Sequence, residues 1–308
     1  MAQEKRVTCG EIEKIWKTRL SRNLREKVKK YDFRYFPLTR KERKFWLVAI
    51  RNTLQSPIRR AGRHRLDEWE AGWFENLKML LAKKDVRALV PLYYSKYKVI
   101  RWRQQLIRPV HRNFEVNMLS LAQEWLFGRY FKNMSSIYDF GCGTGYNLLM
   151  ARKVNRTAKL YGLDWAKSSQ KIIKMIAKGG LLSNVHGRNF DFFNPDYRFT
   201  LDKNSGVYTV GALEQTGRNF RKFIDYLLFN KPKVCVNLEI MSEFLNPKNF
   251  LDKTSIDYAR KRNYLNGFFD YLRLLERKKK IVIHQAQRLY IGALHNENPS
   301  VVVWSPVS

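Results

Sequence analysis

The residues best suited to chemistry form a glycine-rich loop near the middle of the chain. The sequence Asp139-Phe140-Gly141-Cys142-Gly143-Thr144-Gly145 follows a short apolar run and precedes a stretch with helical spacing. Glycines let a backbone approach a ligand closely, because they lack a side chain and tolerate positive φ. The pattern predicts a nucleotide-binding strand, loop and helix. It is not the dinucleotide fingerprint, because Tyr146 stands where that pattern needs its third glycine.

An acid two residues before a Gly-x-Gly-x-Gly turn resembles the cofactor loop of class I S-adenosylmethionine-dependent methyltransferases. The resemblance implies that Gly141, Gly143 and Gly145 surround S-adenosyl-L-methionine. It also implies that Asp139 orients the loop and faces the methionyl ammonium, often through water. S-adenosylmethionine is therefore the cofactor we expect.

Two further acids follow strand-like segments downstream. Residues 159–164 form an apolar run that ends in Asp164, close to the offset of ~20 residues at which nucleotide-binding α/β units place a carboxylate on the ribose hydroxyls. Asp164 is therefore the ribose candidate. By resemblance, Asp191 lies where such enzymes often hold the adenine amine. The alternative for Asp191 is an ordinary turn aspartate before Asn194-Pro195-Asp196.

These residues need a sheet to position them. Helix-like segments at 168–176 and 218–230 separate strand-like runs, of which the later ones span 206–210, 233–240, 280–285 and 301–304. The alternation predicts an α/β fold with a doubly wound, Rossmann-like sheet. By resemblance to methyltransferases, we expect a mostly parallel sheet whose last strand inserts antiparallel.

The first part of the chain lies outside this fold. Apolar residues recur at helical spacing within 11–30, 40–54 and 66–81, with charged residues between them, which predicts amphipathic helices. We therefore divide the chain into a basic helical N-terminal region, residues 1–115, and a methyltransferase domain, residues 116–308.

The chain is strongly basic, with a formal net charge of +32 at pH 7. A protein with such a charge either binds an anionic partner or tolerates the repulsion among its own charged groups. Interleaved cations and aromatic residues in 93–103 would suit phosphate contacts and base stacking. RNA, an anionic membrane surface and an acidic or phosphate-bearing glycan or lipid-linked substrate are the candidate partners. A solvated basic face is the simpler alternative.

Composition also bears on location and on metals. The longest early apolar run, residues 45–50, is far too short for a membrane span, and the first residues lack a signal pattern. We expect a cytoplasmic protein, with peripheral membrane attachment as an option. Cys9, Cys142 and Cys235 are isolated, so they predict neither disulfides nor a zinc cluster, and no other spacing indicates metal ligands.

Methyl transfer from a sulfonium requires donor and acceptor to be held in line, and the acceptor can also need a base. Glu239 is the first candidate for that base, because an acid late in a strand is costly to bury without a partner or a task. Glu214 is the second, since its loop should lie beside the donor. A structural hydrogen bond is the alternative for both. His284 and His295 are weaker candidates.

A narrower resemblance covers the C-terminal half and extends upstream to about residue 91. Residues 210–215, 231–243 and 260–268 are similar to uncharacterised bacterial class I methyltransferases associated with surface-polysaccharide and other small-molecule biosynthesis. The chain departs from that pattern at Asn237 and Ile240, where those proteins have histidine and proline.

These observations predict methyl transfer to an oxygen or nitrogen of a small-molecule or carbohydrate-like acceptor. The alternative is an RNA or protein methyltransferase whose basic N-terminal region binds an anionic partner. A third interpretation is a binding protein with a vestigial cofactor fold.

Overall fold

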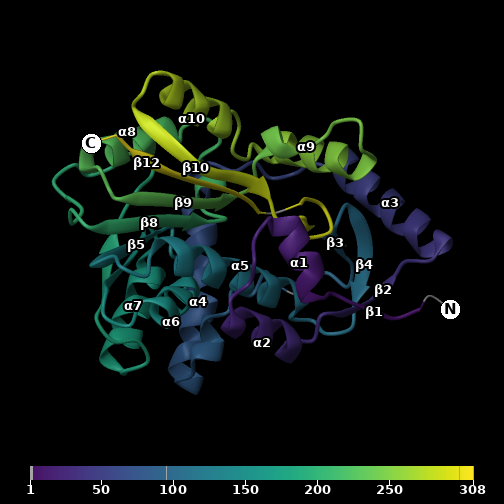
Figure 1. The fold of residues 1–308 in the computed structure, drawn as a ribbon, viewed down its shortest axis with the longest axis horizontal. Helices are drawn as coiled ribbons and strands as arrows, with labels where there is room; N and C mark the ends of the chain where they lie inside the picture. Colours follow the sequence, from purple (N-terminus) through teal and green to yellow (C-terminus); the bar gives the residue numbers. More distant parts are fainter. Residues whose placement is uncertain (1–2, 95, 298, 308) are drawn as a thin grey trace.

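The computed structural model describes residues 3–94, 96–297 and 299–307, which contain two β-sheets and the helices around them (Figure 1). The larger sheet has seven strands and lies in the C-terminal two-thirds of the chain. In spatial order its strands are β10 (Ile281–Arg288), β12 (Ser300–Pro306), β9 (Val234–Glu239), β8 (Ser205–Val210), β5 (Ser136–Phe140), β6 (Lys159–Asp164) and β7 (Val185–Asn189).

Strand directions confirm the predicted fold class. The five strands β5 to β9 pair in parallel, whereas β12 is antiparallel to both β9 and β10. The last strand is thus inserted against the direction of the others, which is the Rossmann-like arrangement of class I methyltransferases. Every residue of β5 and β9 is buried, as expected for parallel strands that are covered on both faces.

Helices cover both faces of this sheet. The helices on one face contribute to a hydrophobic cluster with Ile137 of β5, and they are α4 (Leu66–Lys83), α5 (Phe114–Tyr130), α6 (Tyr146–Val154) and α7 (Lys167–Lys178). Helices α8 (Arg221–Asn230) and α10 (Phe268–Arg277) pack on the other face, against Tyr138. Neighbouring residues of one strand point to opposite faces, so the central strands β5, β6, β8 and β9 contribute to both clusters.

The N-terminal region contains helices α1 (Cys9–Trp16), α2 (Arg22–Lys30) and α3 (Arg40–Gln55) in addition to α4. Thr8 with Glu11, and Thr39 with Glu42, form capping boxes that begin α1 and α3. Helix α9 (Phe250–Arg262), from the C-terminal half, packs beside α3 (Figure 1).

The region also contains strands that the sequence patterns did not reveal. A five-stranded sheet has the order β1 (Lys5–Arg6), β2 (Arg34–Pro37), β4 (Gln105–Pro109), β3 (Ile100–Trp102) and β11 (Ile291–Gly292). Strand β11 comes from the far end of the chain and pairs with β3. The two sheets are therefore interwoven along the sequence.

The predicted boundary between residues 115 and 116 falls in the first turn of α5. Trp125 of α5 stacks on Trp16 of α1, with ring centroids 5.1 Å apart. One hydrophobic cluster contains both tryptophans and extends to β5. Among the described residues, none of the helices combines the length and the apolar character that a bilayer span requires.

Candidate functional site

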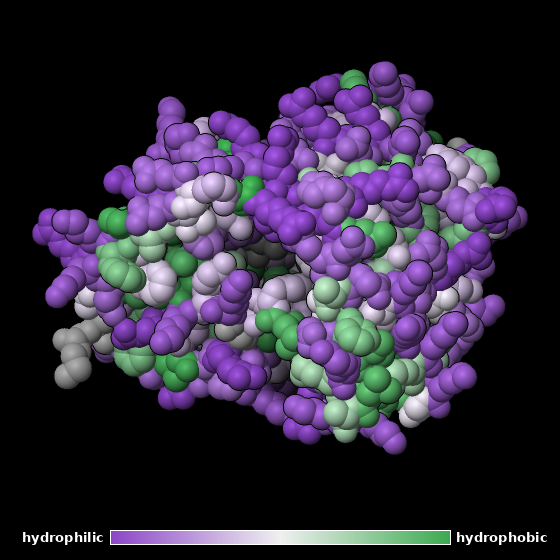
Figure 2. Space-filling view, turned by 180° about the vertical axis from the view of Figure 1, so that it is seen from behind, coloured by the Kyte–Doolittle hydropathy of each residue, from purple (hydrophilic) through white to green (hydrophobic). Residues whose placement is uncertain are grey.

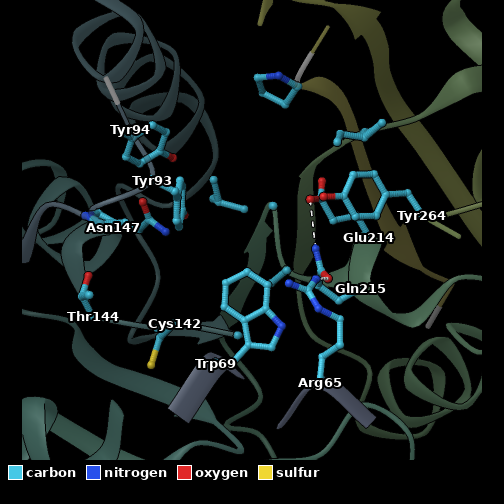
Figure 3. A pocket seen from close by; sticks show the side chains of 18 of the residues that line it. Arg65, Trp69, Tyr93, Tyr94, Cys142, Thr144, Asn147, Glu214, Gln215 and Tyr264 are labelled. Atoms are coloured by element: carbon cyan, nitrogen blue, oxygen red, sulfur yellow. Dashed lines mark hydrogen bonds between the residues drawn. The ribbon is translucent and has the colours of Figure 1, made fainter. Parts of the chain in front are cut away.

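A cavity of about 470 Å³ lies at the carboxyl ends of the central parallel strands, where open α/β sheets bind their ligands. This volume is within the range of about 300–1,000 Å³ that is typical of small-ligand sites. The glycine loop and the segments that follow β6, β7 and β8 line one part of it. Other parts of the wall come from α4, from the start of α5, from the end of α9 and from Tyr93, Tyr94 and Tyr97. Figure 3 shows Trp69 of α4, Tyr93 and Glu214 around a common space.

Two glycines of the loop have no room for a side chain. Gly141 and Gly143 line the cavity with φ angles of 76° and 51°. A Cβ atom on Gly141 would lie 2.3 Å from the Cβ of Ala212, and one on Gly143 would lie 2.8 Å from the ring of Trp73. Gly145 precedes the first residue of α6 and faces Ile173, not the cavity. The loop thus brings bare backbone to the ligand space.

Asp139 lies beside the cavity and does not line it. Its carboxylate is fully buried in β5, and neither oxygen makes a well-formed hydrogen bond within the described residues. Burial raises the pKa of Asp139 well above its usual range, an effect that the Tyr208 hydroxyl on the paired strand opposes only in part.

Asp164 does line the cavity, at the end of β6. Its Oδ2 accepts a hydrogen bond from the backbone N–H of Gly143 at 2.9 Å, and its Oδ1 accepts one from the N–H of Ala166, also at 2.9 Å. Burial raises the pKa of Asp164 to about 6. The carboxylate therefore ties the glycine loop to the neighbouring strand at the cavity wall.

Asp191 is held in a turn and does not line the cavity. Its Oδ1 accepts a hydrogen bond from the Phe193 N–H at 2.8 Å, and its Oδ2 forms an ion pair with Arg63 at 3.1 Å. The wall beside it is aromatic instead, because Phe193 stacks with Trp165 at a centroid distance of 5.8 Å and both rings line the cavity. The geometry matches the turn interpretation more closely than a direct ligand contact.

The structure places the two candidate glutamates differently with respect to the cavity. Glu239 is fully buried and does not line the cavity. Its carboxylate accepts backbone hydrogen bonds from Ala212 at 3.2 Å, Leu213 at 3.1 Å and Glu214 at 3.0 Å. These hydrogen bonds tie Glu239 to the loop after β8, and burial still raises the pKa of Glu239 above its usual range.

Glu214 is the acid that this loop presents to the cavity. It is only 6% exposed, and its Oε2 has no hydrogen-bond partner among the described residues. Burial, with the charge of Glu239, raises the pKa of Glu214. Figure 3 shows the Tyr264 ring beside its carboxylate, with Gln215 and Arg65 on the same side of the cavity.

Several lining residues were not predicted from the sequence. Arg262 and Tyr264 lie within the segment 260–268 that the narrower resemblance covers, yet no local pattern gave them a role. The Arg262 Nε donates a hydrogen bond to the Tyr264 hydroxyl at 3.2 Å. His295, by contrast, was a weaker candidate from the sequence, and it lines the cavity. It lies against Tyr258, with stacked rings 5.4 Å apart, and its pKa is lowered to about 4, mainly by burial.

Glu115, in the first turn of α5, was also missed. It lines the cavity, and no hydrogen bond or ion pair to its carboxylate occurs within the described ranges. Burial raises the pKa of Glu115 to about 7. Burial also raises the pKa of Tyr93, and the charges of Glu214 and Glu115 add to that shift. Acidic residues are common in the first turn of a helix because they interact favourably with the helix dipole. The sequence alone therefore did not single out Glu115.

The predicted basic and aromatic segment 93–103 is divided between the cavity and the protein surface. Tyr93, Tyr94 and Tyr97 line the cavity. Arg101 is 1% exposed and donates hydrogen bonds to the carbonyl oxygens of Leu294 and His295, both at 3.0 Å. Lys96, Lys98 and Arg103 are exposed, and Arg103 pairs with Glu11 at 2.8 Å. Only part of the segment is therefore displayed at the surface, although the sequence pattern had suggested this for the whole.

Within the part of the chain that the structure describes, no group of three His, Cys, Asp or Glu side chains is arranged to hold a metal ion. His284, the other histidine considered, is bonded to Ser305 Oγ at 2.9 Å and does not line the cavity.

No family model matches the chain, and no curated protein matches it significantly. Solved structures do resemble it. The N-methyltransferase NodS from Bradyrhizobium japonicum WM9, in complex with S-adenosyl-L-homocysteine, is 10% identical, with 77% of this chain and 100% of that chain covered and a TM-score of 0.47. Magnesium protoporphyrin IX methyltransferase from Synechocystis PCC 6803 is 11% identical over 64% of this chain and 87% of that chain, with a TM-score of 0.46.

An O-methyltransferase family protein from Burkholderia thailandensis is 13% identical, covers 63% of this chain and 59% of that chain, and has a TM-score of 0.46. These likenesses concern the fold, which the strand order described above establishes on its own.

Proposed function

We propose that this chain binds S-adenosylmethionine in the cavity and transfers its methyl group to an oxygen or nitrogen of a small-molecule or carbohydrate-like acceptor. One observation carries the proposal. A cavity at the carboxyl ends of parallel strands has two glycines without room for a Cβ on one wall, and a buried acid with an unpartnered oxygen, Glu214, on another.

The residues present fit the cofactor. Gly141 and Gly143 would let the amino-acid end and the ribose contact backbone, and Asp164 would face the ribose hydroxyls. Phe193 and Trp165 offer aromatic surface for the adenine. When bound, the cofactor supplies a methyl group on a sulfonium, which is already activated for transfer.

The methionyl ammonium calls for a carboxylate, and two are near. Asp139 has this role by resemblance, but its carboxylate is buried outside the cavity wall. Glu115 reaches the wall and lacks a partner in the described chain. We assign the direct contact with the methionyl ammonium to Glu115. Asp139 would act on the ammonium only electrostatically, from the far side of the glycine loop. Asp191 would act on the adenine side only through the turn that positions Phe193.

Glu214 is the group that we assign to proton transfer. Its carboxylate would accept the proton from the acceptor O–H or N–H as that oxygen or nitrogen bonds to the methyl group. A pKa raised by burial suits this role, because a base is most effective when its proton affinity is near the working pH. Glu239 would act through its hydrogen bond to the Glu214 backbone.

A small acceptor fits the walls better than a polymer does. Tyr258, Tyr264 and Arg262 provide ring faces and a guanidinium beside Glu214, which suit a compact molecule with hydroxyl groups or a ring. The RNA alternative loses part of its sequence support, since Tyr94 and Tyr97 line the cavity and Arg101 is buried.

Calorimetric titration with S-adenosylhomocysteine tests the cofactor, and transfer of tritiated methyl groups into a cell extract tests the acceptor class. We expect binding of S-adenosylhomocysteine but not of NAD, and label in the small-molecule fraction that Glu214→Gln abolishes. Label confined to RNA or protein would contradict the acceptor class. Absence of S-adenosylhomocysteine binding would overturn the whole proposal.

A further inference from the structure

Helix α3 has two apolar faces, although a helix at the edge of a fold needs only one. Its inner face packs through Ile50, Leu47 and Leu54 into a cluster with Leu251 of α9. Its outer face exposes Phe45, of which 64% is accessible, and Val48, of which 46% is accessible. These two residues are neighbours on the helix surface because they are three positions apart.

The same outer face is strongly cationic. Lys41, Lys44 and Arg51 are exposed and share this face with Phe45 and Val48 at helical spacing. Glu42 is the one acidic residue of the helix, and it already pairs with Arg108 at 2.6 Å. No ion pair to Lys41, Lys44 or Arg51 occurs in the described residues, and Arg51 instead lies over the ring of Phe250, 5.4 Å from its centroid. The cations are therefore available to a partner.

We propose that this outer face, defined by Lys41, Lys44, Phe45, Val48 and Arg51, docks on an anionic lipid bilayer. A helix that presents aromatic and aliphatic tips between lysines and arginines suits the membrane interface, because the tips enter the acyl boundary while the cations meet lipid phosphates. Figure 1 places α3 at the edge of the molecule, and Figure 2 shows green hydrophobic side chains among purple ones on that side. The inference rests on this surface and does not depend on the proposed function.

Two observations favour a bilayer over other anionic partners. A phosphate-binding surface needs the cations but gains nothing from an exposed valine, whereas a bilayer uses both. The chain after α3 also leads to the cavity, because the Arg59 carbonyl accepts a hydrogen bond from Arg262 at 2.6 Å and the Ala61 N–H donates one to the Arg262 carbonyl at 2.6 Å. A docked α3 would thus hold the acceptor side of the cavity near the lipid surface.

Sedimentation of the full chain with phosphatidylcholine vesicles, with and without phosphatidylglycerol, tests the proposal. We expect binding only to the anionic vesicles. Lys41→Gln/Lys44→Gln should weaken it roughly thirtyfold, since each cation near an anionic surface contributes roughly a fivefold change in affinity. Phe45→Ser/Val48→Ser should weaken it at least about tenfold and leave the thermal unfolding temperature unchanged, because both side chains are exposed.

The matched control is Phe74→Ser/Leu81→Ser on α4. These side chains are 46% and 55% exposed, but the nearby Lys78 is paired with Glu75 at 2.8 Å, so vesicle binding should not change. A titration with a single-stranded RNA oligomer runs in parallel. Failure of the wild-type chain to bind anionic vesicles, or equal binding by Phe45→Ser/Val48→Ser, would overturn the proposal. RNA binding that requires the lysines, without vesicle binding, would assign the face to nucleic acid and would overturn it as well.

Discussion

The backbone N–H of Glu214 donates a hydrogen bond to the Glu239 carboxylate at 3.0 Å, so one buried acid supports the other. The two acids belong to adjacent parallel strands or their loops, and only Glu214 reaches the cavity. The pair separates two tasks that the sequence could not separate, namely holding the loop and meeting the acceptor.

Replacement of these two acids should give opposite phenotypes. Glu239→Gln places an amide N–H₂ against the Glu214 N–H or, in the flipped orientation, against the Ala212 and Leu213 N–H groups, so we expect a loss of unfolding free energy of about 2–4 kcal/mol in urea denaturation. Glu214→Gln should unfold at or above the wild-type urea concentration, because it removes a buried charge with an unpartnered oxygen. A Glu239→Gln protein as stable as the wild type would contradict the supporting role.

The rate of methyl transfer should depend directly on Glu214 and only indirectly on Glu239. If Glu214 accepts the acceptor proton, Glu214→Gln lowers kcat by roughly 10²–10⁴ while S-adenosylhomocysteine affinity stays within about threefold of wild type. The measurement is a single-turnover assay beside calorimetric titration. Equal losses of binding and of rate would indicate a disturbed cofactor site instead of a lost base.

The contact to the methionyl ammonium can be assigned with two ligands that differ only at the amino-acid end. Glu115→Gln should weaken S-adenosylhomocysteine at least about tenfold and leave methylthioadenosine unchanged, because methylthioadenosine has no ammonium group. Asp139→Asn serves as the comparison. If Asp139→Asn shows this pattern and Glu115→Gln does not, the assignment to Glu115 is wrong and the role implied by the resemblance stands.

Stability should fall as the pH rises through the titration of Glu115. The folded-state pKa of about 7 lies above the unfolded value near 4.3, so the unfolded chain releases its proton first. The unfolding temperature should therefore decrease between about pH 4.5 and pH 7 and then level off with respect to this group. Glu115→Gln should flatten this decrease, whereas Glu26→Gln, at an exposed site, should not. Parallel curves for wild type and Glu115→Gln would refute the prediction.

The glycine loop allows a test with a compensating change. Gly143→Ala combines a positive φ with a Cβ 2.8 Å from Trp73, so it should cost about 1–3 kcal/mol and abolish S-adenosylhomocysteine binding. Adding Trp73→Leu should recover part of the stability, since it removes the clash but not the backbone strain. Gly72→Ala, in the same helix as Trp73 and with open space around it, is the matched control and should bind normally.

The sequence predicted those parts of the molecule that depend on local pattern. The loop from Asp139 to Gly145, the acid at the end of β6 and the inserted last strand follow from spacing along the chain together with the methyltransferase resemblance. The sequence did not predict the β3–β4 hairpin, because its turn has Arg103 and Gln104 at positive φ, where asparagine or glycine is the usual signal.

Long-range contacts account for the remaining differences. Whether an acid at a strand end faces a cavity or a neighbouring loop depends on how that loop folds back, as Glu239 and Glu214 illustrate. The approach of Trp73 to Gly143 joins residues 70 positions apart in the numbering, and Arg262 reaches the cavity from α9. No window of sequence contains both members of such a pair.

The pairing of β11 with β3 has a consequence for how the protein is made. During translation, residues 100–102 leave the ribosome long before Ile291 and Gly292, their partners in the ladder. This edge of the small sheet must therefore stay unpaired until residues 291 and 292 have been synthesised, and an uncovered edge invites association with other chains. Nascent chains halted before residue 291 should be dependent on chaperones, and truncation at that point should yield aggregates.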